Sequence, residues 1–83
     1  IVATIINANE TEVEYALSVA NKAQKEWKKL TSIERGNHLN KLADKLVEKS
    51  GVIGKVLALE SGKSLEDATN ETIYAAEVTR YHA

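Results

Sequence analysis

Apolar residues recur at helical spacing through most of this chain, and this pattern predicts a mainly α structure. The predicted helices cover residues 10–29, 32–49, 52–61 and 65–82. The first of them carries an apolar stripe that ends at Trp27. Before it, residues 1–6 are β-branched except for Ala3, which favours a short extended strand. We therefore expect a four-helix array preceded by a short N-terminal strand that has no partner strand in the chain.

Helix-capping residues support these predicted boundaries. Three polar residues stand where an N-cap is expected and have an acidic residue three positions later: Asn9, Thr31 and Ser64. The dipeptide Ser50-Gly51 interrupts the pattern between the second and third helices. Gly62 follows the third helix, at the position where a left-handed residue commonly closes a helix. Lys63 beside it suits the negative end of the helix dipole.

One face of the fourth predicted helix is unusually small in side-chain size. It consists of Leu65, Ala68, Thr72, Ala75, Ala76 and Thr79. We expect this face to dock on a larger body, because small side chains let another backbone approach closely. In the isolated chain, this face and the unpaired strand would leave apolar surface uncovered, which predicts self-association as a dimer or a swapped helical assembly. An Ala75→Glu substitution is then expected to weaken the association.

The composition excludes several classes of function. Charged residues make up 28% of the 83 positions, and 11 Lys and Arg against 12 Asp and Glu give a net charge of −1. The interspersed signs leave no basic stripe for a nucleic acid and no cationic face for a membrane. Cysteine is absent, so the chain itself holds no disulfide, thiolate nucleophile or zinc–thiolate site. Without a charged-then-apolar leader, we expect a cytoplasmic protein, with residues 1–83 forming one unit.

Two features could indicate ligand binding, but neither meets the requirements of such a site. Gly62-Lys63-Ser64 resembles the end of a phosphate-binding P-loop. That loop requires a glycine at position 57, where this chain has Leu57, and a strand before it, where a helix is predicted. A helix C-cap followed by an N-cap explains the tripeptide better. His38 and His82 lie far apart without a second ligand four residues on, which does not indicate a metal site.

Three further features have a structural and a functional interpretation. We interpret Trp27 as the core anchor of the first helix, with a ligand-binding aromatic residue as the alternative. The helix dipole explains Glu66-Asp67 in a first turn without an acid/base pair. Arg35 opposes the dipole in its own first turn, so a salt bridge or a bond to a loop carbonyl is as reasonable as a solvated charge. We assign no catalytic, cofactor-binding or metal-binding residue to the chain.

The order of these elements resembles the N-terminal segment of the NAD(P)-dependent aldehyde dehydrogenases. In that family, a short strand leads into a helix with spaced small residues and a final tryptophan, represented here by Val13, Ala16, Ala20, Ala23 and Trp27. A Glu-Arg pair, here Glu34-Arg35, opens the next helix. The third helix ends in a Glu-x-Gly-Lys element, here Glu60-Ser61-Gly62-Lys63. The last helix carries an acidic residue, Ala-Ala and then Arg-Tyr-x-Ala, matched by Glu71, Ala75-Ala76 and residues 80–83.

This resemblance implies a parent enzyme and a role for the segment. The family oxidises aldehydes to carboxylic acids by a cysteine thiolate, with an Asn, a Glu and NAD or NADP. Its catalytic residues and glycine-rich cofactor turn lie downstream of the Arg-Tyr-x-Ala element. Residues 1–83 then correspond to the helical outer layer of the α/β cofactor-binding domain. The isolated segment is expected to be inactive and to bind no NAD(P). Two runs, 23–27 and 59–63, resemble the succinate-semialdehyde and lactaldehyde dehydrogenase branch.

A different class of function stays open beside this one. The chain also fits a freestanding helical interaction module whose apolar faces bind a partner helix or groove. The absence of Phe and Met weakens that alternative, because adaptable helix-binding surfaces often use them. A helix-turn-helix nucleic-acid binder comes third because the charge is balanced. A glycine-rich turn and a later cysteine in a continuation of the chain would favour the enzyme. The aldehyde, the choice between NAD and NADP and the parent's oligomeric state are left open.

Overall fold

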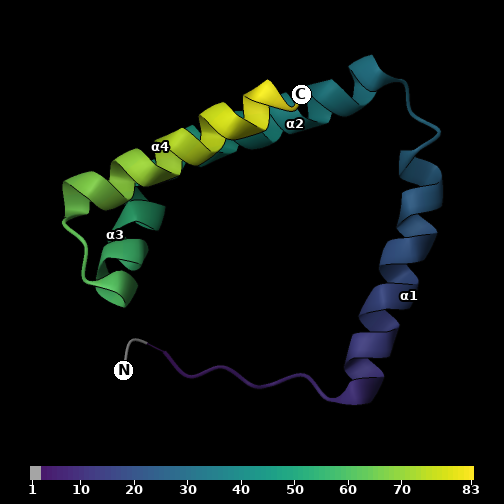
Figure 1. Cartoon of the computed structure of the whole chain (residues 1–83), viewed down its shortest axis with the longest axis horizontal. Coiled ribbons are helices and arrows are strands. Elements are labelled where there is room, and N and C mark those ends of the chain that lie inside the picture. The colour runs from purple at the N-terminus through teal and green to yellow at the C-terminus, as the bar shows by residue number, and fades with distance from the viewer. Residues whose placement is uncertain (1–2) are drawn as a thin grey trace. The chain divides into compact units, whose positions relative to one another are not determined.

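The computed structural model describes residues 3–83, which form four α-helices and no strand (Figure 1). The helices are α1 (Glu10–Trp27), α2 (Ser32–Glu48), α3 (Ser50–Ser61) and α4 (Leu65–Tyr81). The predicted mainly α fold class is confirmed, with boundaries that differ by at most two residues. The chain divides into two compact units, residues 1–31 and residues 32–83. Among the described residues, none of the helices has the length and apolar character needed to cross a bilayer.

The predicted N-terminal strand is absent from the described part of the chain. Residues 3–9 have no regular structure, and Ile5 and Ile6 are 85% and 95% exposed. The β-branched composition favours extended backbone, but a strand exists only when its backbone groups bond to a neighbouring strand. No segment of residues 3–83 offers that edge. Ile1 and Val2, the first two residues of the predicted strand, lie outside the described residues.

Helix α1 begins where its capping residue predicts. The Asn9 side chain accepts a hydrogen bond from the backbone N–H of Glu12 at 2.8 Å, while the Asn9 carbonyl accepts from Val13 at 3.0 Å. The helix ends at Trp27 rather than at residue 29, because Lys29 and Leu30 bond to carbonyls only three residues earlier. No residue of α1 is buried.

The break between α2 and α3 is narrower than the sequence predicts. Ser50 and Gly51 belong to α3, and the interruption is confined to Lys49, whose φ of −95° and ψ of 4° depart from the helical region. The Ser50 hydroxyl donates to the carbonyl of Val47 at 2.8 Å. The bend therefore retains a hydrogen-bonded path between the two helices, and Gly51 remains helical.

The turn from α3 to α4 follows the predicted chemistry. Gly62 adopts φ 73° and ψ 13°, and its N–H donates to the carbonyl of Ala58 at 2.9 Å. Two residues later, the Ser64 hydroxyl accepts a hydrogen bond from the N–H of Asp67 at 3.1 Å. The left-handed glycine and the N-cap reverse the chain within three residues, which lays α4 back against α3 and α2. Figure 1 shows α4 running along α2, with α3 beneath the first turns of α4.

Candidate functional site

The closest packing in residues 32–83 occurs where α4 meets α2 and α3. The buried residues there are small, and we call them the small-residue interface: Gly36, Ala43, Gly54, Ala68, Thr72 and Ala76. The three from α4 recur every four residues, so they form one line along that helix. Ala43 and Ala68 are 0% exposed and Ala76 is 1% exposed. Among the described residues, no large side chain is fully buried, so small side chains form this core and let the helices approach closely.

This interface corrects the prediction for the fourth helix. Ala68, Thr72 and Ala76 were expected to dock on another body, but they are buried against the chain's own α2 and α3. Leu65, by contrast, is 56% exposed, and Ala75 is also exposed. Periodicity shows that these residues share a face, but it does not show which other element covers that face.

Gly54 sets how closely α3 approaches α4. A Cβ atom added to Gly54 would lie 2.5 Å from the Thr69 hydroxyl oxygen, 2.8 Å from its Cα and 2.9 Å from its backbone nitrogen. Two of these three atoms are backbone, so a rotamer change of Thr69 would not make enough room. Only glycine permits this contact, and a larger residue would have to separate the helices.

The one buried polar side chain among residues 3–83 has its hydrogen bond within α4. Thr72 is 5% exposed, and its hydroxyl donates to the carbonyl of Ala68 at 3.1 Å. A threonine can bury its oxygen in this way, because the preceding turn of its own helix supplies the acceptor. The hydroxyl is therefore satisfied by its own helix and serves packing.

Two ion pairs lie at the margins of the interface. An Arg80 nitrogen lies 2.6 Å from an Asp44 carboxylate oxygen, which joins the end of α4 to the second half of α2. The Lys63 ammonium group, in the turn before α4, pairs with the carboxylate of Glu71 in the second turn of α4. The Arg80 and Asp44 side chains are 44% and 68% exposed, so solvent screens their attraction. The buried small residues therefore hold α4 in place more than these exposed pairs do.

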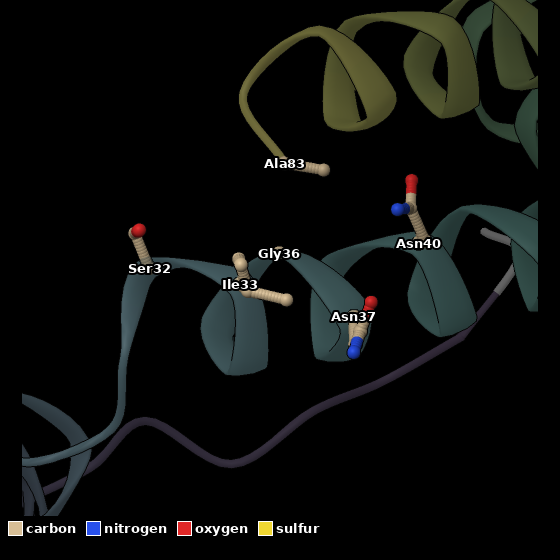
Figure 2. A pocket seen from close by; sticks show the side chains of 6 residues that line it. All are labelled: Ser32, Ile33, Gly36, Asn37, Asn40 and Ala83. Atoms are coloured by element: carbon tan, nitrogen blue, oxygen red, sulfur yellow. The ribbon is translucent and has the colours of Figure 1, made fainter.

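A shallow depression of about 320 Å³ lies where the end of α4 passes the start of α2. Its lining consists of Ser32, Ile33, Gly36, Asn37, Asn40 and Ala83. Figure 2 shows the α2 side chains along one helix and Ala83 facing them from the end of α4. A Cβ on Gly36 would approach the Ala83 carbonyl carbon to 3.0 Å, so this is also a close crossing. The lining side chains offer hydroxyl and amide groups but no carboxylate, imidazole or thiol.

Gly62, Ser64 and His82, which the sequence raised as possible ligand-binding residues, lie at helix ends. Gly62 and Ser64 are the C-cap of α3 and the N-cap of α4, and a helix rather than a strand precedes them. This arrangement contradicts the phosphate-loop interpretation and confirms the capping one. His82 is the C-cap residue of α4 and packs edge-on against Tyr81, with ring centroids 5.2 Å apart. Within residues 3–83, no three His, Cys, Asp or Glu side chains are close enough to hold a metal ion.

Trp27 differs from its predicted role. It is half-buried rather than a core residue, and it lines an apolar depression with Ala23, Glu26 and Leu30. The predicted helix is confirmed for α1. No residue of α1 is buried, however, so the Trp27 indole does not anchor a core in this helix.

Sequence reasoning missed Gly36 and Gly54 as contact positions. Both lie inside helices, where glycine is unfavourable by roughly 1 kcal/mol relative to alanine. A glycine retained in a helix interior signals close backbone approach, and this signal could have identified both positions. Gly51 carries the same signal, but a Cβ added there would have nothing within 4 Å, so composition alone does not separate the two cases.

Comparison with known proteins identifies relatives of the whole chain. The sequence profile of the aldehyde dehydrogenase family matches residues 1–83. An α-ketoglutaric semialdehyde dehydrogenase of Bacillus subtilis (strain 168) is 37% identical over 83 residues, covering 100% of this chain and 17% of the relative. An NADP-dependent glyceraldehyde-3-phosphate dehydrogenase of Streptococcus equinus is 39% identical over 75 residues, covering 90% of this chain and 16% of the relative. No solved structure matches the chain.

A third relative has the same partial coverage. A glutarate-semialdehyde dehydrogenase of Pseudomonas aeruginosa (PAO1) is 32% identical over 76 residues, covering 92% of this chain and 16% of the relative. The chain thus spans 16–17% of the length of these curated relatives. The family profile covers the chain from end to end, in agreement with the resemblance of its helices and turns. The chain belongs to the aldehyde dehydrogenase family.

Proposed function

We propose that residues 1–83 are the N-terminal helical part of the cofactor-binding domain of an NAD(P)-dependent aldehyde dehydrogenase. The observation that carries this proposal is the family match over all 83 residues, combined with coverage of only 16–17% of the relatives' length. The small-residue interface supports a scaffolding role, because it fixes three helices against one another without presenting a reactive group. The partner of the segment is then the rest of the same enzyme.

The parent enzyme oxidises an aldehyde to a carboxylic acid. Water supplies the second oxygen, and a hydride and a proton leave as NAD(P)H and H⁺. The family's thiolate must come from elsewhere in the parent, because this chain has no cysteine. We assign no catalytic, cofactor-binding or metal-binding residue to the segment, and we propose that it is inactive alone.

The names of two relatives support a semialdehyde as the substrate. Both the Bacillus subtilis and the Pseudomonas aeruginosa relatives are semialdehyde dehydrogenases. The Streptococcus equinus relative is NADP-dependent and acts on a phosphorylated aldehyde, so the family match leaves both cofactors as candidates. We also propose a cytoplasmic location, because the reaction draws on a pool of nicotinamide dinucleotide.

The exposed apolar side chains support both burial by the parent and self-association of the isolated segment. Leu17 of α1 is 66% exposed, Val52 of α3 is 67% exposed and Tyr81 of α4 is 84% exposed. Apolar surface on this scale calls for a covering partner. In the parent, other parts of the enzyme would cover it. In the isolated chain, a second copy is the available partner.

The test compares the complete reading frame with the 83-residue chain. Reduction of NAD and of NADP is followed spectroscopically with succinate semialdehyde, glutarate semialdehyde and lactaldehyde. We expect turnover by the complete protein and none by the segment, and no saturable micromolar isotherm when NAD is titrated into the segment by calorimetry. A complete protein that oxidises no aldehyde would contradict the proposal and favour the helical interaction module. Turnover or micromolar NAD binding by the segment would contradict its assignment as a scaffold.

A further inference from the structure

Helix α3 is apolar on two opposite sides. Gly54 faces α4, where an added Cβ would lie 2.8 Å from the Thr69 Cα. Val52, Val56 and Leu59 recur after four and then three residues, so they form one line nearly opposite Gly54, which we call the α3 stripe. Their exposed fractions are 67%, 46% and 63%. A helix that packs on one side only normally carries polar residues on the other, and at these three positions α3 does not.

Helix α2 shows the normal arrangement in the same unit of the chain. Its buried residues, Gly36 and Ala43, lie in the small-residue interface, and the opposite side carries Lys41, Lys45 and Glu48. The Lys45 ammonium group lies 3.1 Å from the Glu48 carboxylate, and both side chains are exposed. Contact with water therefore suits the outer side of α2 and does not suit the outer side of α3.

Two charged residues, Lys55 and Glu60, flank the α3 stripe. Helical spacing places them beside the stripe, on its two edges, rather than in line with it. The methylene groups of a lysine cover neighbouring apolar surface while its ammonium group stays in water. A segment that packs on the stripe can therefore bury the three aliphatic side chains and leave both charges solvated.

We propose that the rest of the parent polypeptide packs on the α3 stripe and leaves the outer side of α2 in solvent. This inference rests on the proposed function, in which residues 1–83 are part of a longer enzyme. The chain spans only 16–17% of the length of its curated relatives, so most of such an enzyme lies outside these residues. The α3 stripe names the surface on which that remainder packs.

The size of the α3 stripe favours a segment of the same polypeptide over a second copy of the chain. A stable interface between separate proteins uses about 20–30 residues and about 800 Å² on each partner, and separate molecules also lose translational and rotational freedom when they bind. Three aliphatic side chains on a 12-residue helix fall well short of that size. A segment of the same polypeptide is held nearby by its covalent connection, so a small apolar patch is enough for it to pack.

The test measures the rate of thiol labelling at single introduced cysteines in the complete protein. Val56→Cys places a thiol on the α3 stripe, and Lys41→Cys places one on the outer side of α2 as the matched control. Each native protein is treated with a maleimide, and peptide mass spectrometry gives the labelled fraction at the introduced position alone. Each rate is divided by the rate of the same variant in urea. We expect Val56→Cys to react at least about tenfold more slowly than Lys41→Cys, because a covered thiol reacts only when the structure around it opens.

A second variant and the isolated segment complete the design. Leu59→Cys, on the same stripe, should be protected like Val56→Cys, and it replaces that variant if the first does not fold. In the dilute 83-residue segment, Val56→Cys and Lys41→Cys should react at similar rates, because both positions are exposed there. Protection that appears only in the complete protein would assign the cover to the rest of the polypeptide.

Two results would overturn the inference. Equal labelling rates for the stripe and control variants in the complete protein would show that nothing covers the α3 stripe. Protection that is lost when dilution separates the subunits of the complete protein would place a second copy on the stripe. Aldehyde oxidation by the unsubstituted complete protein is a separate readout. A protein that oxidises an aldehyde but labels freely on the stripe keeps the proposed function and loses this inference.

Discussion

Gly54→Ala should destabilise the chain even though alanine is the better helix former. The new Cβ would lie 2.5 Å from the Thr69 hydroxyl oxygen and 2.8 Å from the Thr69 Cα. Relieving that overlap requires α3 to move away from α4 at a point of backbone contact, and overpacking of this kind costs about 1–3 kcal/mol. The gain in helix propensity offsets about 0.8–1 kcal/mol of it. We expect a net loss of about 1 kcal/mol, and at most about 2 kcal/mol, in the free energy of unfolding.

Gly51→Ala is the matched control on the same helix. A Cβ at Gly51 has nothing within 4 Å, and Gly51 lies in the first turn of α3. The substitution should therefore stabilise the chain by up to about 0.5–1 kcal/mol through helix propensity and reduced unfolded-state entropy. Urea titrations of the helical circular dichroism signal, at one fixed protein concentration, give both values. If Gly54→Ala proves as stable as Gly51→Ala, backbone contact at Gly54 does not limit the packing of α3 on α4.

Three further substitutions test other parts of the structure. Gly62→Ala places a side chain at φ 73° and should lower the free energy of unfolding by about 1 kcal/mol, measured as a lower urea midpoint. An unchanged midpoint would mean that the turn adopts another backbone conformation without cost. Asn9→Ala removes the 2.8 Å cap of α1 and should cost about 1 kcal/mol, seen as faster amide exchange in its first turn and not in α4. Ala76→Glu places a charge at a position that is 1% exposed and should unfold residues 32–83. Ala75→Glu places the same charge at the exposed neighbouring position and should leave helix content unchanged. Equal helix content in these two variants would contradict the observed orientation of α4.

Local features of the sequence determined the helices and their ends. Helical periodicity is a property of neighbouring residues, so it identified all four segments within two residues of their observed bounds. Asn9, Gly62 and Ser64 act on the turn of helix beside them, and each cap is formed as expected. The family could also be identified locally, because its motifs lie at these same turns and helix ends.

Tertiary structure decided what each face contacts. The stripe through Ala68, Thr72 and Ala76 was visible in the sequence, but only the folded chain shows α2 and α3 covering it. Gly54 and Gly51 look alike in sequence, and they differ because Thr69, fifteen residues after Gly54, approaches one and not the other. The N-terminal strand failed for the same reason, because β propensity favours extended backbone while a strand requires a second strand. Spacing along a chain sets which residues share a face, and the long-range path of the backbone sets what lies opposite.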